Sequence, residues 1–156
     1  MNPILLIVCC FFLSSYLWAD NGSDIQLINK KVADIEKNKR QLNYFEVAIH
    51  SEEIESVPPI ARFYYSLKTE NLLILQVDVG HEIFLNRFTY YFDNDVLIKY
   101  VKESLNHPDA PPKEAVIYND SGLVLWKNTN EPLLDSRQIQ NLFMLNMNAL
   151  KSFSRY

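Results

Sequence analysis

Short polar turns separate a series of strand-like runs in the middle of the chain. The runs are rich in aromatic and β-branched residues and cover residues 60–67, 72–79, 82–92, 96–102, 114–118 and 123–127. A parallel pair of strands needs a crossover connection of about a dozen residues or more, and most of these connections are far shorter. The spacing therefore predicts antiparallel hairpins in chain order, which together form a β-meander of about six strands.

The turn residues between these runs favour tight reversals. Gly80-His81 is predicted to form one turn and Asp93-Asn94-Asp95 another, because Asn and Asp side chains bond to nearby backbone and tolerate left-handed geometry. A calcium-binding loop is the alternative for the second turn. Such a loop spreads its oxygen ligands over about twelve residues and ends in a bidentate acid. Since Val96 begins a strand at once, we expect a turn.

Amphipathic helices are predicted before and after the strands. The first places Ile25, Ile28, Val32 and Ile35 on one face. The last follows Asp135, and its predicted apolar face comprises Ile139, Leu142, Phe143, Met147, Leu150 and Phe153. Residues 42–49 are compatible with either a strand or a helix extension. The fold expected is therefore α+β, an antiparallel meander with both helices packed mainly on one face.

The first nineteen residues contain no charged side chain. They are almost wholly apolar from Pro3 to Trp18, a run slightly shorter than the roughly 20 residues that span a bilayer, and the small Ala19 precedes a polar stretch. This pattern is typical of a signal peptide. We expect a cleaved signal at 1–19, with an uncleaved membrane anchor as the alternative, and a single periplasmic or secreted domain at 20–156.

The composition of the expected mature domain excludes several functions. Both cysteines, Cys9 and Cys10, lie within the leader, which leaves no thiol for a disulfide, a zinc site or a nucleophile. The net charge of −4 argues against nucleic-acid binding, which calls for a basic face. Contact with a membrane is expected only through an uncleaved signal segment.

No cluster of residues indicates catalysis or a bound cofactor. His50, His81 and His107 fall in separate loops or turns, whereas a zinc site needs three or four converging ligands. The three glycines form neither a phosphate-binding loop nor a nucleophile elbow. Carboxylates that could be paired for glycoside cleavage are expected instead to be solvated surface charges; they are Asp78, Glu82, Asp93 and Glu103. No catalytic, cofactor-binding or metal-binding residue is therefore predicted.

One hairpin motif resembles a known group of proteins. Tyr90 to Ile98 reads aromatic-Tyr-Phe-Asp-Asn-x-x-Leu-Ile, preceded by Gly80-His81-Glu82 and followed by a second such hairpin. This pattern resembles small exported bacterial proteins that carry a signal peptide and Tyr-Tyr-Phe-Asp-Asn hairpins, and more weakly the hairpin repeats of the membrane-occupation-and-recognition-nexus (MORN) type. The resemblance covers about residues 60–127. It implies an exported hairpin domain and assigns no functional residue.

One face of the predicted sheet carries a mixed aromatic and polar patch. Side chains alternate along strands, which places on this face the residues Arg62, Tyr64, Gln76, Asp78, Arg87 and Tyr91. Tyrosine and arginine are favoured anchors of binding surfaces. We expect a non-enzymatic exported protein that binds another protein or an envelope component through this open face or through the proline-rich loop at 104–113.

Two other functions stay open at this point. One is an exported hydrolase acting on wall glycan or peptide, which requires two acids that converge in a cleft. The other is a carrier of an apolar ligand, which requires a cavity between sheet and helices lined by Phe84, Phe88 and Met147.

Overall fold

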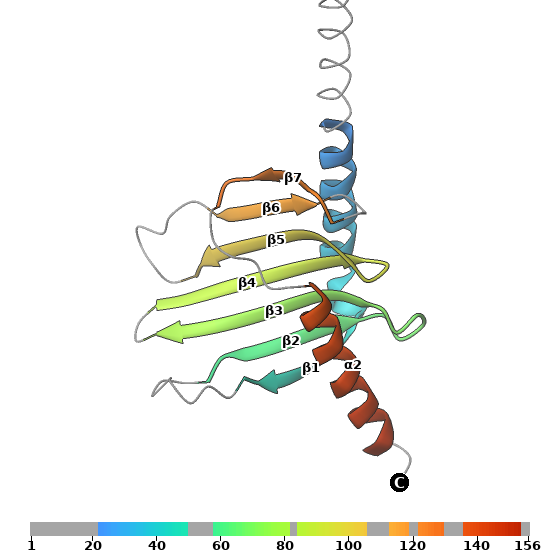
Figure 1. Ribbon diagram of the computed structural model, residues 1–156. Coiled ribbons are helices and arrows are strands. Elements are labelled where there is room, and N and C mark those ends of the chain that lie inside the picture. The colour runs from blue at the N-terminus through green and yellow to red at the C-terminus, as the bar shows by residue number, and fades with distance from the viewer. Residues whose placement is uncertain are drawn as a thin grey trace, which may run out of the picture.

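The computed structural model is a single antiparallel sheet with a helix before it and a helix after it (Figure 1). The predicted signal segment and most of the proline-rich loop lie outside the residues that the structure describes. Those residues are 22–49, 58–81, 84–105, 113–118, 122–129 and 136–153.

The strands follow one another across the sheet in the order of the chain. An N-terminal helix over residues 22–38 leads through the short 3-10 helix η1 (Lys39–Gln41) into the sheet. The strands are β1 (Asn43–Ala48), β2 (Ile60–Tyr65), β3 (Leu72–His81), β4 (Phe84–Asp93), β5 (Val96–Ser104), β6 (Glu114–Tyr118) and β7 (Val124–Lys127). Helix α2 (Ser136–Phe153) comes last. The predicted α+β meander is confirmed, with a seventh strand where residues 42–49 were ambiguous.

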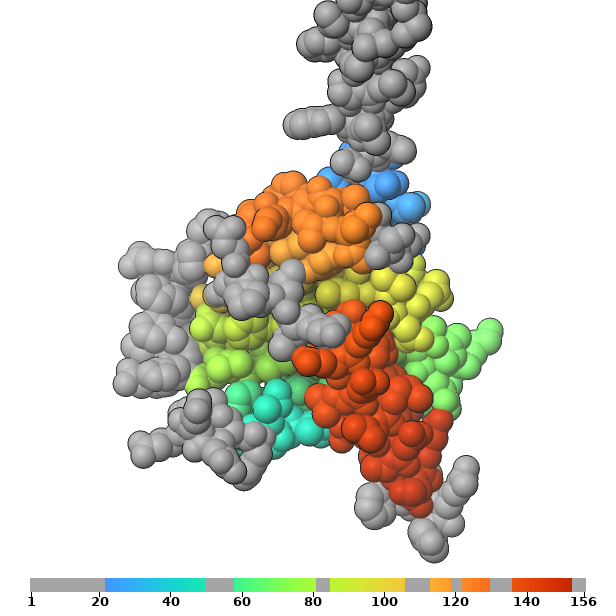
Figure 2. Space-filling view, in the orientation of Figure 1, coloured from blue at the N-terminus to red at the C-terminus, as the bar shows by residue number. Residues whose placement is uncertain are grey.

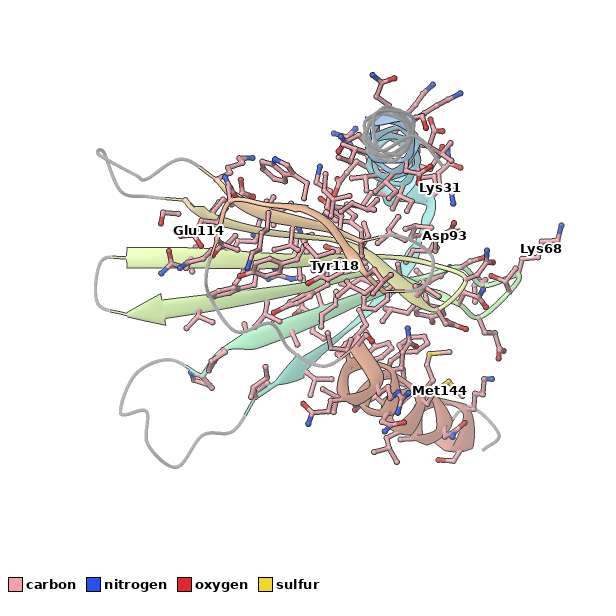
Figure 3. All side chains as sticks on the ribbon, turned by 45° about the horizontal axis from the view of Figure 1, so that its top comes forward. Lys31, Lys68, Asp93, Glu114, Tyr118 and Met144 are labelled. Carbon is pink, nitrogen blue, oxygen red and sulfur yellow. The ribbon has the colours of Figure 1, made fainter. Side chains whose placement is uncertain are left out.

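The two helices lie on opposite faces of the sheet, so the prediction that both cover one face is wrong (Figure 3). The N-terminal helix buries Ile28 and Val32 against one face, which includes Ile74 and Ile98. Helix α2 covers the other face. The reason is that the face under the N-terminal helix is apolar at one end, around Ile74, Ile98 and Ile117, although Asp78 and Arg87 make it polar farther along the strands. Both faces therefore carry apolar side chains that need a cover.

Helix α2 packs on the sheet through an aromatic cluster. Phe143, which is 1% exposed, lies in roughly parallel orientation beside Phe45 and Phe63, with ring centroids 5.9 and 6.1 Å away. Leu142 and Leu150 remain 39% and 44% exposed, so the buried face of α2 is narrower than predicted. In Figure 2 the helix forms a ridge over part of this face, with strand atoms visible on either side.

The turn chemistry predicted at Asn94 and Asp95 is confirmed. Both residues have left-handed backbone, with φ of 48° and 65°, and they join β4 to β5. The prediction of a turn at Gly80-His81 is wrong. Both residues belong to β3, and His81 pairs with Phe84 of β4. Gly80 does not take the positive φ that would mark a glycine turn; among the described glycines only Gly122 does.

Candidate functional site

A groove of about 460 Å³ opens beside the N-terminal helix, on the sheet face that this helix covers. The helix and η1 contribute Glu36 and Lys39 to its wall, and Lys99 of β5 also lines it. A second groove of about 390 Å³ shares Glu36 and Lys39 and continues over Tyr64. Lys39 therefore lies at the junction of the two grooves.

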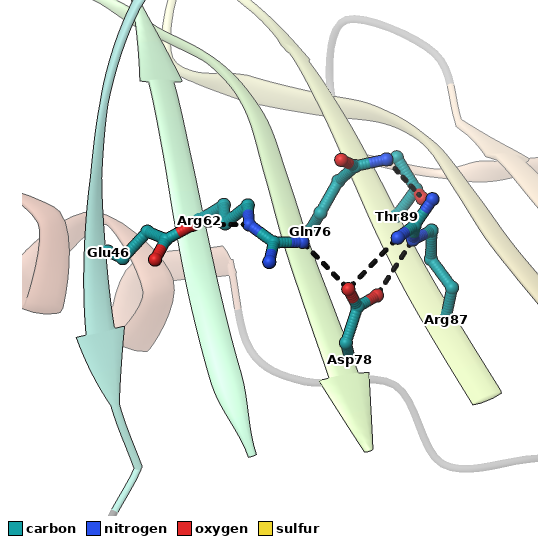
Figure 4. A network of polar contacts seen from close by, with 6 residues as sticks. All are labelled: Glu46, Arg62, Gln76, Asp78, Arg87 and Thr89. Atoms are coloured by element: carbon teal, nitrogen blue, oxygen red, sulfur yellow. Dashed lines mark hydrogen bonds and ion pairs between the residues drawn. The ribbon is translucent and has the colours of Figure 1, made fainter. Parts of the chain in front are cut away.

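A network of ion pairs borders the first groove (Figure 4). Asp78 on β3 lies directly opposite Arg87 on β4, and its carboxylate accepts hydrogen bonds from Arg87 Nε (2.7 Å) and Nη2 (2.9 Å). Arg62 donates to the same carboxylate from Nη1 (2.8 Å) and to Glu46 from Nε (2.5 Å). The hydrogen bond from Arg87 is the main cause that lowers the pKa of Asp78, so this carboxylate is held ionised between two guanidinium groups.

The side chains of Lys39 and Lys99 are half-buried. Lys39 Nζ lies 4.6 Å from the centre of the Tyr64 ring, and Lys99 Nζ donates a 2.7 Å hydrogen bond to Asn29 Oδ1. Neither forms an ion pair with a carboxylate of the described ranges. Burial lowers the pKa of both; for Lys39 the charges of Arg87 and Arg62 lower it further, against the opposing effect of Glu36.

The carboxylates of the first groove are already engaged. Glu36 Oε1 accepts a 2.8 Å hydrogen bond from the Tyr91 phenol, and Glu103 Oε2 lies 2.5 Å from Lys113 Nζ. The groove thus has four cationic side chains, Lys39, Arg87, Lys99 and Lys113, against two acidic ones. Its charge is opposite in sign to the net −4 of the whole chain.

The predicted patch residues occupy one sheet face, as strand alternation requires, but that face is not open. Arg62, Tyr64, Asp78 and Arg87 are half-buried and lie around the two grooves. Tyr91 and Gln76 are only 8% and 6% exposed. They are covered because the N-terminal helix packs across this face, where Tyr91 joins the cluster around Val32.

Sequence reasoning missed the residues that give the groove its charge. Lys39 follows the last helical turn, where a lysine is ordinarily solvated, and its position over Tyr64 depends on which face the helix covers. Lys99 could not be placed from the turn alone. The two-residue turn at Asn94-Asp95 pairs Phe92 with Leu97, and a register shift between Tyr91 and Phe92 then pairs Tyr91 with Lys99. Without that shift Lys99 would lie on the opposite face of the sheet.

The residues named for the other functions are distributed elsewhere. Phe88 and Met147 pack into the core beneath α2, and the Phe84 side chain lies outside the described residues. Asp93 forms an ion pair with Lys31 of the N-terminal helix, with 2.5 Å between Asp93 Oδ2 and Lys31 Nζ (Figure 3). Glu82 lies outside the described residues. The described residues include no group of three or more His, Cys, Asp or Glu side chains arranged to hold a metal.

Within the ranges given above, no helix is both long enough and apolar enough to cross a membrane. No family model matches the chain, and comparison with the curated proteins and with the solved structures finds no match.

Proposed function

We propose that this chain is a non-enzymatic exported binding protein, periplasmic or secreted, that holds a component of the cell envelope in the groove beside the N-terminal helix. The observation that carries the proposal is the pair of half-buried lysine side chains, Lys39 and Lys99, whose ammonium groups have no carboxylate within 4.0 Å among the described residues. Partly burying a charge without a counter-ion in contact costs free energy. Such an arrangement is typical of a site whose missing charge is supplied by a ligand.

The size of the groove favours a small ligand or the end group of a polymer. Ligand sites typically have volumes of about 300–1,000 Å³, and the groove of about 460 Å³ falls within this range. A stable interface with another protein buries about 800 Å² on each partner. A single groove of this kind suits an envelope component better than a broad protein surface.

Export is supported by the leader sequence rather than by the fold. The uncharged apolar segment at 1–19, the absence of cysteine after it and the resemblance of Tyr90 to Ile98 to hairpins of small exported bacterial proteins all favour the periplasm or the medium. The proline-rich loop at 104–113 was the other candidate contact, and its residues 106–112 are not described.

An exported hydrolase acting on wall glycan or peptide is the second candidate, because the groove brings together two carboxylates. Glu36 and Glu103 both line it. Glycosidases use such a pair, one as acid and the other as base or nucleophile. Each carboxylate here already has a partner, Tyr91 or Lys113, so binding is the better-supported function.

A groove-filling variant tests the proposal. The mature domain is immobilised, and envelope material from the native source is passed over the wild type, Val101→Trp and Leu145→Trp. Val101 lines the groove, whereas Leu145 is 69% exposed on α2 across the sheet. We expect a component that the wild type and Leu145→Trp retain and that a folded Val101→Trp does not. Equal retention by all three contradicts the proposal.

The hydrolase is tested on the same preparations. Purified wall glycan and wall peptide are incubated with the wild type, Glu36→Gln and Glu103→Gln, and soluble fragments are measured. We expect no release from any of them. Release by the wild type that either substitution abolishes replaces binding with catalysis.

A further inference from the structure

We infer that the ligand of this groove carries an anionic oxygen group, a carboxylate or a phosphate, which contacts the ammonium groups of Lys39 and Lys99. The inference rests on the proposed function, because it takes the groove to be the binding site, and it adds the chemical class of what is bound.

The charge of the groove is not balanced by its own residues. Arg87 is paired with Asp78, and Lys113 with Glu103. These pairs leave the two ammonium groups of Lys39 and Lys99 against one carboxylate, that of Glu36. One negative charge from a ligand would complete the balance.

Lys39 and Lys99 differ from the other described lysines because they are partly buried and yet have no carboxylate within 4.0 Å among the described residues. Four lysines elsewhere on the domain or at the groove rim have a carboxylate within 4.0 Å: Lys31 with Asp93, Lys102 with Glu114, Lys113 with Glu103 and Lys151 with Glu70. Lys39 and Lys99 are half-buried, and they contact an aromatic ring and an amide oxygen instead of a carboxylate. Both contacts keep an ammonium charged without neutralising it.

The uncharged lining indicates the rest of the ligand. Val32 and Val101 supply apolar surface, and the buried Gln76 and Thr89 supply polar groups. Gln76 Nε2 lies 3.5 Å from Thr89 Oγ1, at the long limit of a hydrogen bond, so the amide retains capacity for a ligand oxygen. A ring that bears hydroxyl groups and one acidic group, as in a sugar acid or a sugar phosphate, matches this lining.

Titration of the mature domain with matched probes tests the inference. The probes are glucuronate, glucose 6-phosphate, uncharged glucose and a short Asp/Glu-rich peptide, followed by calorimetry and by amide NMR shifts. We expect at least one sugar acid to bind and to shift the amides of Lys39, Thr89 and Lys99, with glucose about tenfold weaker or worse. Glucuronate and glucose 6-phosphate separate a carboxylate from a phosphate.

Neutral variants locate the contact. Lys39→Met and Lys99→Met keep most of the apolar part of the lysine side chain and remove its charge. Each is expected to weaken binding of the acidic probe by about tenfold. Lys68→Met, at the exposed β2–β3 turn (Figure 3), is expected to bind like the wild type. Thermal unfolding confirms that each variant is folded, so a loss of binding is not a loss of structure.

Three results overturn the inference: glucose binding as tightly as the acids, acidic probes binding equally to the wild type and Lys39→Met, or the acidic peptide binding while the sugar acids do not. These results are separable from failure of the proposed function. If Val101→Trp abolishes retention of envelope material but the acidic probes neither bind nor compete, the groove is a binding site for an uncharged ligand. If Val101→Trp retains the material, the groove is not the binding site.

Discussion

The Tyr91 phenol on β4 donates a 2.8 Å hydrogen bond to Glu36 on the N-terminal helix, joining residues 55 positions apart in the chain. Burial, and then the bond to Glu36, raises the pKa of Tyr91, so the phenol keeps the proton it donates. This contact and the Lys31–Asp93 ion pair fix the helix across the sheet, and they thereby define one wall of the groove.

Tyr91→Phe is expected to lower the free energy of unfolding by about 1–2 kcal/mol, because a hydrogen bond to a charged acceptor is lost. Urea unfolding of the wild type, Tyr91→Phe, Glu36→Gln and the double variant measures this loss of free energy. If the double variant is no less stable than Tyr91→Phe alone, the two side chains stabilise the fold through their contact with each other. Full additivity of two substantial single effects would show that the contact is not what holds the helix.

Asp78→Asn is expected to be less stable than the wild type at neutral pH by about 1–3 kcal/mol, because Arg62 and Arg87 lose a shared counter-ion. The pKa of Asp78 is lowered in the folded state from its ordinary 3.8. Its ionised form therefore stabilises the fold above that pH, and the contribution is lost as the pH falls through the lowered value. The difference between the proteins should shrink below about pH 4. Asp34→Asn, at an exposed helix position, is the control.

Asp95→Gly is expected to raise the free energy of unfolding by about 1 kcal/mol. Asp95 has a φ of 65°, where a Cβ atom is strained and glycine is not, and Asn-Gly is the favoured pair for a two-residue hairpin turn. Thermal melts of Asp95→Gly and Asp95→Ala measure the effect, and the alanine variant should be the less stable of the two. A destabilising glycine would mean that the Asp95 side chain is needed for more than the turn.

Phe143→Ala is expected to lower the free energy of unfolding by about 3–5 kcal/mol, because it removes a fully buried ring from the cluster with Phe45 and Phe63. Leu145→Ala changes a position two residues farther along α2 that is 69% exposed, and it should change the free energy of unfolding by less than about 0.5 kcal/mol. Chemical denaturation measures the free energy of unfolding of both variants and of the wild type. Similar effects of the two substitutions would place the wrong face of α2 against the sheet.

The sequence was sufficient to predict the meander, and the reason lies in its turns. Connections as short as Asn94-Asp95 permit only antiparallel neighbours, whatever the rest of the chain does. The side on which each helix packs was not predictable in the same way. Helical periodicity shows that Ile28 and Val32 are buried, but it does not say against which face.

The candidate site was predictable only in part. Alternation along β3 and β4 places Asp78 and Arg87 on one face, and the structure joins them in an ion pair. Lys39 could not be assigned from its neighbours in the chain, because its surroundings come from a helix end and a strand that meet only in the folded protein. An acidic chain also gives no compositional sign of a local cationic groove.

The agreement between strand order and chain order has a consequence for how the domain matures. Each strand pairs with the strand made just before it, so the sheet can grow strand by strand while the chain is being synthesised. The N-terminal helix is already available to shield one side during this growth. The apolar side chains of the face beneath α2 remain exposed to water until this last helix is made, so the growing domain is most prone to aggregate through that face.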